Sequence, residues 1–294
     1  MSHSVPQAPG LRRLPFGVPA VIPGRTLSFG LTLFWVTALV VLPLTALATK
    51  PFGRGFKVML HALGDARALH ALALSFGCAL GAASLCTLLG LLLAWVLERV
   101  RPPGWRLLDA LVDIPFALPT AVAGITLTSL YAPTGWIGAP LDRLGIKVAF
   151  TPLGITLALV FVGLPFVVRT VLPVLRELPR ELEEAAETLG ARPGQIARRV
   201  LLPALAPALA TGFGLAFARG VGEYGSVIFI AGNRPMVSEI APLLIVIRLQ
   251  EFNYAGASAI GLVMLLAAAL CLLAITALRR RLPASLGVRL GGAA

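Results

Sequence analysis

The sequence predicts an all-α, polytopic membrane protein with six transmembrane helices. Hydrophobic residues make up 57% of the 294 positions and charged residues only 13%, and the mean hydropathy is +0.89, values that exclude an ordinary water-soluble globule. Apolar stretches long enough to cross a bilayer recur along the chain, because a helix of about 20 residues spans the roughly 30 Å hydrocarbon core. The surplus of basic residues, 25 against 13 acidic, is scattered at the ends of these stretches instead of forming one patch with aromatic residues, so no nucleic-acid partner is expected.

The N-terminal part is expected to be a tail followed by a retained membrane helix. Residues 1–26 are rich in proline and glycine and contain three arginines, which predicts a disordered, basic, cytoplasmic tail. The apolar stretch 27–49 is the first predicted transmembrane helix. Its last residues, Ala46-Leu47-Ala48, resemble a signal-peptidase site, but the apolar core is longer than that of a signal peptide, so a retained helix is favoured.

Five further stretches are long and apolar enough to be spans. By residue number they lie within 68–97, 107–131, 152–172, 204–231 and 256–278. A short apolar piece at 242–247 is too brief to cross a bilayer and is expected to be a re-entrant or peripheral helix. Residues 279–294 form a second tail. Because Lys and Arg outside the spans are more frequent on the side that holds both termini, both termini are expected in the cytoplasm.

The third predicted span, 107–131, differs from the others because it carries polar and helix-breaking residues. They are Asp109, Asp113, Pro115, Pro119 and Thr120. Proline leaves backbone carbonyls without partners, so irregular backbone at this depth is expected inside the bundle or beside a water-filled cavity, where the Thr120 hydroxyl would supply a neutral donor. Residues 113–120 are therefore candidates for lining or gating a path, with a kinked packing helix as the alternative.

Charged residues inside apolar spans are costly and mark functional candidates. Arg219 and Glu223 lie four residues apart midway along the fifth predicted span, which predicts an ion pair that either fixes the spans or lines or gates the path. Arg169, near the cytoplasmic end of the fourth, is expected to extend its guanidinium to the membrane interface. Asp109 and Asp113 share a face, so at least one is expected to pair with an arginine of a neighbouring span or to face water.

The most polar part of the second half of the chain lies between the fourth and fifth spans. This docking segment, residues 177–203, has apolar residues at helical spacing and glutamates on the other faces, a pattern typical of a short amphipathic helix. Gly190 is expected to end that helix in the left-handed conformation and Pro193 to begin another. The small residues Ala185, Ala186 and Gly190 would let a partner's backbone approach closely, although an ordinary surface helix is the alternative.

The spacing within the docking segment resembles the EAA signature of permease subunits of binding-protein-dependent ABC importers. The matching residues are Glu184, Ala185, Ala186, Gly190, Leu202 and Pro203. Val200 departs from the pattern, because the family usually has isoleucine there. In that family the motif is the cytoplasmic coupling helix, which seats in a groove of the ATPase subunit, so the resemblance implies that these residues contact an ATPase.

The resemblance extends over residues 68–278, which look like the transmembrane domain of a type I ABC importer with the MetI-like fold. Three stretches are similar to the permeases of sulfate/thiosulfate importers, with molybdate/tungstate permeases as the nearest alternative. They are DIPFALPTAVAGITL from Asp113, GEYGSVIFIAGN from Gly222 and RLQEFNYAGASAI from Arg248.

This resemblance implies a permease of the bacterial inner membrane that moves sulfate or thiosulfate by alternating access. Its partners would be a second homologous permease subunit of the W type, two ATPase subunits that bind ATP and Mg, a periplasmic sulfate/thiosulfate-binding protein, and the membrane lipid around its own spans. The candidate residues that line or gate the path are Asp113, Pro115, Pro119, Thr120, Arg219 and Glu223.

The sequence offers no site for catalysis, a cofactor or a metal. It contains no GxxxxGK[ST] phosphate-binding loop, so ATP hydrolysis would require a separate chain. The three histidines have no plausible serine or cysteine partner, and the three cysteines fall inside apolar runs without ligand-like spacing. The chain is therefore expected not to be an enzyme and to carry no cofactor or metal of its own.

Two functions of other classes remain open. A secondary, ion-coupled anion carrier would use Asp113, Arg219 and Glu223 as coupling sites, and a membrane scaffold would have no role in transport. The internal repeat found in many secondary transporters is not visible in this sequence.

Overall fold

The computed structural model describes residues 25–50 and 64–281, and within these ranges every regular element is a helix, as the sequence predicts. The two expected tails lie almost wholly outside the described residues. The chain divides into two compact units, 1–50 and 51–294, and each is described by itself.

The first unit contains one apolar helix in three consecutive parts. α1 (Arg25–Val36), η1 (Thr37–Val41) and α2 (Leu42–Thr49) follow one another along the chain. The helix over residues 26–49 is long and apolar enough to cross a membrane, and no residue in its most apolar part is buried. A helix of this kind matches the first span expected at 27–49.

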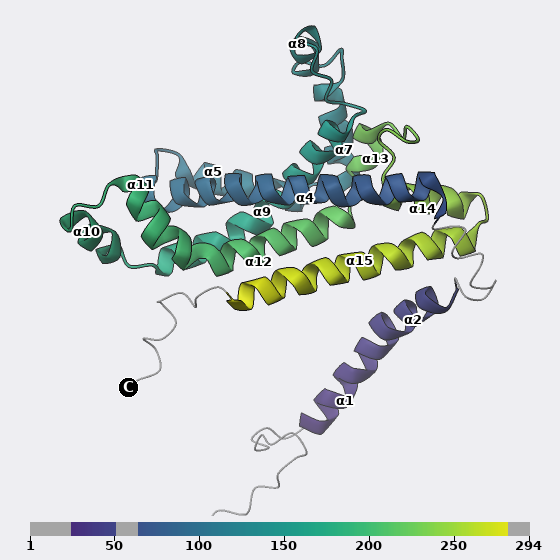
Figure 1. The fold of residues 1–294 in the computed structure, drawn as a ribbon, viewed down its shortest axis with the longest axis horizontal. Coiled ribbons are helices and arrows are strands. Elements are labelled where there is room, and N and C mark those ends of the chain that lie inside the picture. Colours follow the sequence, from purple (N-terminus) through teal and green to yellow (C-terminus); the bar gives the residue numbers. More distant parts are fainter. Residues whose placement is uncertain (1–24, 51–63, 282–294) are drawn as a thin grey trace, which may run out of the picture. The chain divides into compact units, whose positions relative to one another are not determined.

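Four long helices run side by side in the second unit (Figure 1). They are α4 (Ala66–Trp95), α9 (Pro152–Glu177), α12 (Leu202–Val221) and α15 (Tyr254–Arg281). Val167 of α9 lies between α4 and α12: a Cβ added to Gly90 would come 2.7 Å from Val167 Cγ1, and one added to Gly212 would come 3.1 Å from Val167 Cα. Small residues at these crossings let the backbones approach closely, which is how helices commonly pack in membranes.

Each of the three wide-turn helical stretches among the described residues lies just before a proline. η1 leads to Pro43, η3 (Val96–Val100) to Pro102 and η4 (Ala197–Leu201) to Pro203. At Pro43 and Pro203, which lie inside a continuing helix, the ring of proline clashes with the carbonyl of the preceding turn, and a wider turn relieves that clash. The helix that becomes α12 therefore begins already at α11 (Pro193–Ile196), so that Pro203 lies inside it and not at its start. η3 instead ends the helix that begins with α4, because Arg101 is left-handed with φ of 45° before Pro102.

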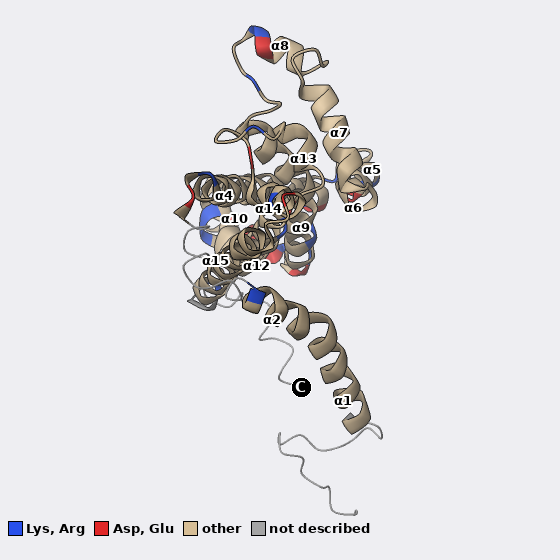
Figure 2. Ribbon diagram, turned by 90° about the vertical axis from the view of Figure 1, so that its right-hand side faces the viewer, with Lys and Arg blue, Asp and Glu red and all other residues tan. Residues whose placement is uncertain are grey.

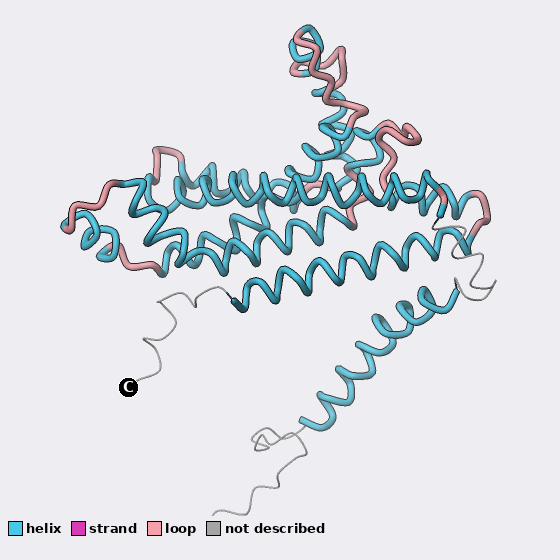
Figure 3. Tube along the Cα trace, in the orientation of Figure 1, coloured by secondary structure: helices cyan, strands magenta, loops and turns pink. Residues whose placement is uncertain are grey.

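The third predicted span is broken. α5 (Trp105–Val112) and α6 (Ile114–Ala117) meet α7 (Thr120–Tyr131) at an angle of 111°, and α7 rises away from the long helices toward α8 (Gly138–Arg143) (Figure 3). The break falls within residues 113–120, where the sequence predicts that regular helix is interrupted. The described residues hold five helices long and apolar enough to cross a membrane, and a sixth if the bent pair is one span.

Two prolines explain where the break falls. Leu118 and Pro119 are extended, with ψ of 133° and 130°, because a residue that precedes proline is driven out of the helical region. Pro115 stands in the first turn of α6, where no intrahelical partner exists for the backbone N–H that proline lacks.

The fifth predicted span ends earlier than expected. α12 stops at Val221 instead of 231, because the chain turns at Gly222 before the separate short helix α13 (Val227–Ala231) begins. The turn between them, 222–226, contains Glu223, which the sequence placed inside a helix. Because residues 222–231 continue the apolar composition of α12, hydropathy predicted one uninterrupted span there.

The short apolar piece expected at 242–247 is α14 (Ala241–Gln250). It packs against α4 and α15 at the end of the bundle opposite the docking segment (Figure 1). Its Leu244 is fully buried in a small apolar cluster with Leu72 of α4 and Ile260 of α15. α14 is thus a helix held at the rim of the bundle, as one of the two predicted alternatives requires.

Candidate functional site

The docking segment, 177–203, folds as the sequence predicts. α10 (Glu181–Thr188) is followed by Gly190, whose φ of +82° is the left-handed conformation expected there, and the next helix begins at Pro193. The two short helices form a bend at one end of the second unit (Figure 1). The predicted order of helix, tight turn and helix is confirmed.

The residues of the EAA-like spacing that lie on this bend are accessible. Glu184, Ala185 and Gly190 are exposed, Ala186 is half-buried, and no residue of α10 is buried. Leu189 leaves 88% of its surface exposed beside these small residues. The bend therefore presents small and apolar groups outward, a composition suited to contact with another protein.

The two remaining residues of the EAA-like spacing lie elsewhere. Leu202 and Pro203 are exposed in the first turn of α12, separated from α10 by α11 and η4. The predicted coupling residues therefore fall on two helices, and the structure brings only the first four together on the bend.

An ion pair ties α10 to the end of the α4–η3 helix. Arg99 of η3 lies 2.7 Å from Glu183, and its Nη2 also donates to the carbonyl of Leu178 at 3.2 Å. The side chain of Arg99 is 9% exposed and that of Glu183 is 23% exposed. Little water reaches the pair, so its attraction is stronger than at an open surface. The pair therefore joins α10 directly to the η3 end of the α4–η3 helix.

Glu98 of η3, whose side chain is 8% exposed, joins η3 to the end of α9 and to the residue before α10. Its carboxylate accepts from Arg101 at 2.6 Å and from Arg176 of α9 at 3.1 Å, and its carbonyl accepts from Arg180 at 3.4 Å. This cluster was not predicted from the sequence. The available signal was a glutamate among arginines directly after an apolar run.

Arg169 of α9 binds both carboxylates of the broken segment. Its Nη1 donates to Asp109 Oδ1 at 2.5 Å, and its Nε and Nη2 donate to the two oxygens of Asp113 at 2.9 and 2.7 Å. The predicted pairing with an arginine of a neighbouring span is confirmed. α5 and α6 bring these two counter-charges within reach of Arg169, and its expected position at the membrane interface stays a prediction.

The two stretches predicted to line or gate a path meet each other. A Cβ added to Gly225 would clash with Thr120 Oγ1 at the start of α7, and one added to Gly124 would clash with the carbonyl of Ser226. The broken backbone near Pro119 and the turn after α12 therefore touch through glycines. Asp113 lies farther back in the chain, on the Arg169 cluster.

Arg219 and Glu223 form the predicted ion pair, with Arg219 Nη1 2.5 Å from Glu223 Oε2. Their predicted place midway along a span is wrong, because Arg219 lies in the last turn of α12 and Glu223 in the turn that follows. The Glu223 side chain is 2% exposed, and its other oxygen accepts from the backbone N–H and the hydroxyl of Ser226 at 2.9 and 3.0 Å. Glu223 thus holds the turn in shape.

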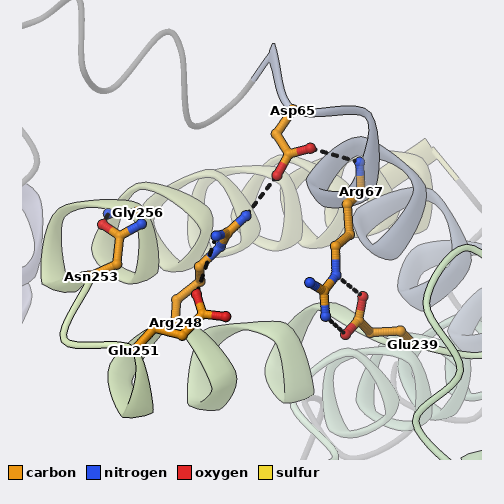
Figure 4. Close-up of polar contacts among 7 residues, drawn as sticks. All are labelled: Asp65, Arg67, Glu239, Arg248, Glu251, Asn253 and Gly256. Carbon is orange, nitrogen blue, oxygen red and sulfur yellow. Dashed lines mark hydrogen bonds and ion pairs between the residues drawn. The ribbon is translucent and has the colours of Figure 1, made fainter.

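A further group of charges, not singled out from the sequence, joins α4 to α14 at the end opposite the docking segment (Figure 4). Arg67 donates from Nε and Nη2 to the two oxygens of Glu239, both at 2.7 Å, and the Glu239 side chain is 1% exposed. Arg248 donates to Asp65 at 2.7 Å and to Glu251 at 3.2 Å. The only signal in the sequence was a glutamate directly before the apolar run of α14.

No group of three or more His, Cys, Asp or Glu side chains among the described residues is arranged to hold a metal ion. The polar groups described above are instead pairs and triads of arginine with carboxylates. Such ion pairs hold neighbouring helices together, and they break when a helix moves or when one of the charges is removed.

Comparison with known families matches residues 86–287 to the family described as the binding-protein-dependent transport system inner membrane component. The probable sulfate transport system permease protein of Nephroselmis olivacea is 50% identical over 248 residues, which cover 84% of this chain and 87% of that protein. The sulfate transport system permease protein of Escherichia coli is 48% identical over 261 residues, which cover 89% and 94%.

Solved structures share the fold at lower identity. A chain of a bacterial alginate ABC transporter, in complex with a periplasmic protein bound to alginate pentasaccharide, superimposes with a TM-score of 0.72 at 19% identity over 88% of this chain and 95% of that one. A chain of the MetNI methionine ABC transporter in an inward facing conformation gives 0.52 at 20% identity, covering 74% and 94%.

Proposed function

This chain belongs to the family of binding-protein-dependent transport system inner membrane components, and on that premise we propose that it is the permease subunit of an ATP-driven importer of sulfate and thiosulfate. Two relatives that are 48% and 50% identical over most of the chain carry the name of sulfate permease, which favours sulfate over the molybdate or tungstate alternative. The single observation that carries the proposed coupling role is the exposed EAA-like bend at α10.

The proposed assembly supplies what this chain lacks. A second homologous permease of the W type completes the path, two ATPase subunits bind ATP and Mg, and a periplasmic sulfate/thiosulfate-binding protein delivers the anion. The proposed location is a bacterial inner membrane, and the distribution of Lys and Arg favours both termini and the docking segment in the cytoplasm. In this arrangement Glu184, Ala185, Ala186 and Gly190 contact the ATPase.

The proposed mechanism is alternating access driven through the docking segment. Closure of the two ATPases displaces α10, and the Arg99–Glu183 pair carries the displacement to the end of α4. The long helices then tilt as one body, because α4, α9 and α12 are closely packed around Val167. The broken backbone at Pro115, Pro119 and Thr120 lines or gates the path where it meets the turn held by Arg219 and Glu223.

The experiment that tests this function reverses one charge on the bend. Glu184→Lys, assembled with the partner subunits and reconstituted in liposomes, should retain insertion and assembly but lose most ATP-driven uptake of labelled sulfate. Glu177→Lys is the matched control, because Glu177 is an exposed glutamate that ends α9 at the border of the docking segment, outside the bend of α10 and α11, with no ion pair among the described residues. Unchanged uptake in the Glu184 variant would refute the docking role.

The same reconstitution separates the other classes of function. A secondary carrier would take up sulfate in liposomes that contain this chain and the second permease but no ATPase. A scaffold would leave uptake unaltered when Asp113 or Glu223 is replaced. Strict dependence of uptake on the ATPase supports the importer.

A further inference from the structure

A cavity of about 210 Å³ lies between the loop that precedes α9 and the loop that follows α13. Its lining includes two cations, Lys147 and Arg234, the hydroxyl of Tyr131 and one carboxylate, Asp142. Neither cation has an ion-pair partner among the residues that the structure describes. The cavity therefore combines uncompensated positive charge with hydrogen-bond donors.

The position of this cavity is fixed relative to the docking segment. Its wall includes Thr151, directly before the first residue of α9, whereas the docking segment begins at the last residue of α9, Glu177. The 26 residues of α9 extend over about 39 Å at 1.5 Å per residue. The cavity thus lies across the full length of a membrane span from α10, near the charged α8 end visible in Figure 2.

The two loops contain strained backbone. Phe150, Asn233 and Met236 all have positive φ values, 63°, 48° and 59°, which non-glycine residues rarely adopt. Phe150 N–H donates to the carbonyl of Ile230 at 2.7 Å, which joins one loop to the end of α13. Strained backbone of this kind persists only where the surroundings fix it, and it is concentrated at ligand sites and switch regions.

The size and chemistry of the cavity select its ligand. Pockets for drug-sized molecules measure about 300–1,000 Å³, so 210 Å³ suits a smaller group. A guanidinium and an ammonium favour an anion with several oxygens, because the guanidinium can bind two of them at once. Asp142 on the same wall repels an anion and limits how long it stays, as a transit site requires.

We propose that Lys147 and Arg234 form an entry site that receives a small tetrahedral oxyanion at the end of the bundle remote from the ATPase. This inference rests on the proposed function for the direction of transport. The site would collect the anion released by the delivering protein before it reaches the broken backbone at Pro119. The cations set the affinity, and Asp142 keeps it low.

The first test measures protection of Lys147 by inorganic sulfate. The assembled importer, without its binding protein, is treated with an amine-acylating reagent, and acylation of Lys147 is followed by mass spectrometry with Lys50 as the internal reference. Sulfate should slow acylation of Lys147 in a saturable way, and chloride at the same ionic strength should not. Equal protection by both salts would overturn the proposal.

Variants sharpen this measurement. Arg234→Gln should raise the sulfate concentration needed for protection about tenfold, since it removes a charged donor, and Asp142→Asn should lower it. Arg143→Gln is the matched control, because Arg143 is an exposed arginine of α8 that does not line the cavity. An unchanged sulfate requirement in Arg234→Gln would contradict the site.

Uptake measurements separate this proposal from the function on which it rests. If the wild-type importer takes up no sulfate with ATP, the proposed function fails, and the protection experiment still decides the site. If Lys147→Gln/Arg234→Gln imports sulfate as the wild type does, the entry role fails while the function stands. If the sulfate-free binding protein protects Lys147 and sulfate does not, the cavity receives a protein carboxylate and the proposal is overturned.

Discussion

Replacing Glu183 with glutamine removes the carboxylate that pairs with Arg99 and leaves the enclosed guanidinium without its counter-charge. Removing one partner of a fully buried ion pair costs about 3–5 kcal/mol. Glu183 keeps 23% of its side chain exposed, and Arg99 retains its bond to the carbonyl of Leu178 at 3.2 Å, so we expect about 2 kcal/mol. Because about 1.4 kcal/mol corresponds to a tenfold change in an equilibrium constant, the equilibrium between attached and detached α10 shifts roughly 30-fold toward the detached state.

The assay is the amount of sulfate transported per ATP hydrolysed by the reconstituted importer. We expect this ratio to fall severalfold in Glu183→Gln and in Arg99→Gln, because ATPase closure then moves α10 without moving η3. The double variant should transport no less sulfate per ATP than the more impaired of the two single variants, since the two residues act as one contact. Glu181→Gln is the control, because Glu181 is an exposed glutamate of the same helix with no ion pair among the described residues.

Additive losses would refute this reasoning. If the coupling energy between the two substitutions, derived from the melting of the assembled importer in detergent, is below about 0.5 kcal/mol, the side chains act independently. The route of transmission from α10 to α4 would then lie elsewhere.

Three further substitutions test the packing and the ion pairs. Arg169→Gln should loosen the broken third segment by about 1–2 kcal/mol, because the two carboxylates it leaves are partly exposed, with side-chain exposures of 29% and 47%; faster hydrogen exchange over α5 and α6 would report it, and unchanged exchange would count against it. Gly124→Ala should destabilise the protein by about 1–3 kcal/mol through overpacking where α7 meets the chain before α13, and so lower its melting temperature, whereas Gly77→Ala, with open space around it, should not; equal melting temperatures of the two variants would contradict the close contact. Glu239→Gln should cost about 3 kcal/mol because its carboxylate is 1% exposed and bound at two atoms, and Glu251→Gln, 47% exposed, less than about 1 kcal/mol; similar losses would argue against a tight clasp.

Local signals in the sequence were sufficient for the elements and for the bend that carries the candidate site. Gly190 and Pro193 each demand a specific backbone conformation, so helix, turn and helix could be predicted without any knowledge of neighbours. The like charges of Asp109 and Asp113 required a counter-charge, and Arg169 supplies it. These inferences depend only on chain geometry and charge.

Inferences that required distant neighbours were less successful. Which arginine pairs with Asp109 and Asp113 could not be predicted, because Arg169 lies 60 and 56 residues away from them in the sequence. The end of α12 was missed because the residues after Gly222 remain apolar, and hydropathy alone cannot detect a turn inside an apolar run. The Arg67–Glu239 pair joins positions 172 apart, a separation that no local pattern encodes.

That separation has a consequence for how the protein is made. Ribosomes add about 5–20 residues per second, so α4 emerges roughly 10 to 35 seconds before Glu239 and Arg248 are synthesised. Throughout that interval Asp65 and Arg67 have neither of these partners, and the end of α4 that bears them is unfastened. The Arg67–Glu239 and Asp65–Arg248 ion pairs in Figure 4 are therefore among the last contacts formed during biogenesis. A nascent chain released before α14 is made would lack the contacts that hold this end of α4.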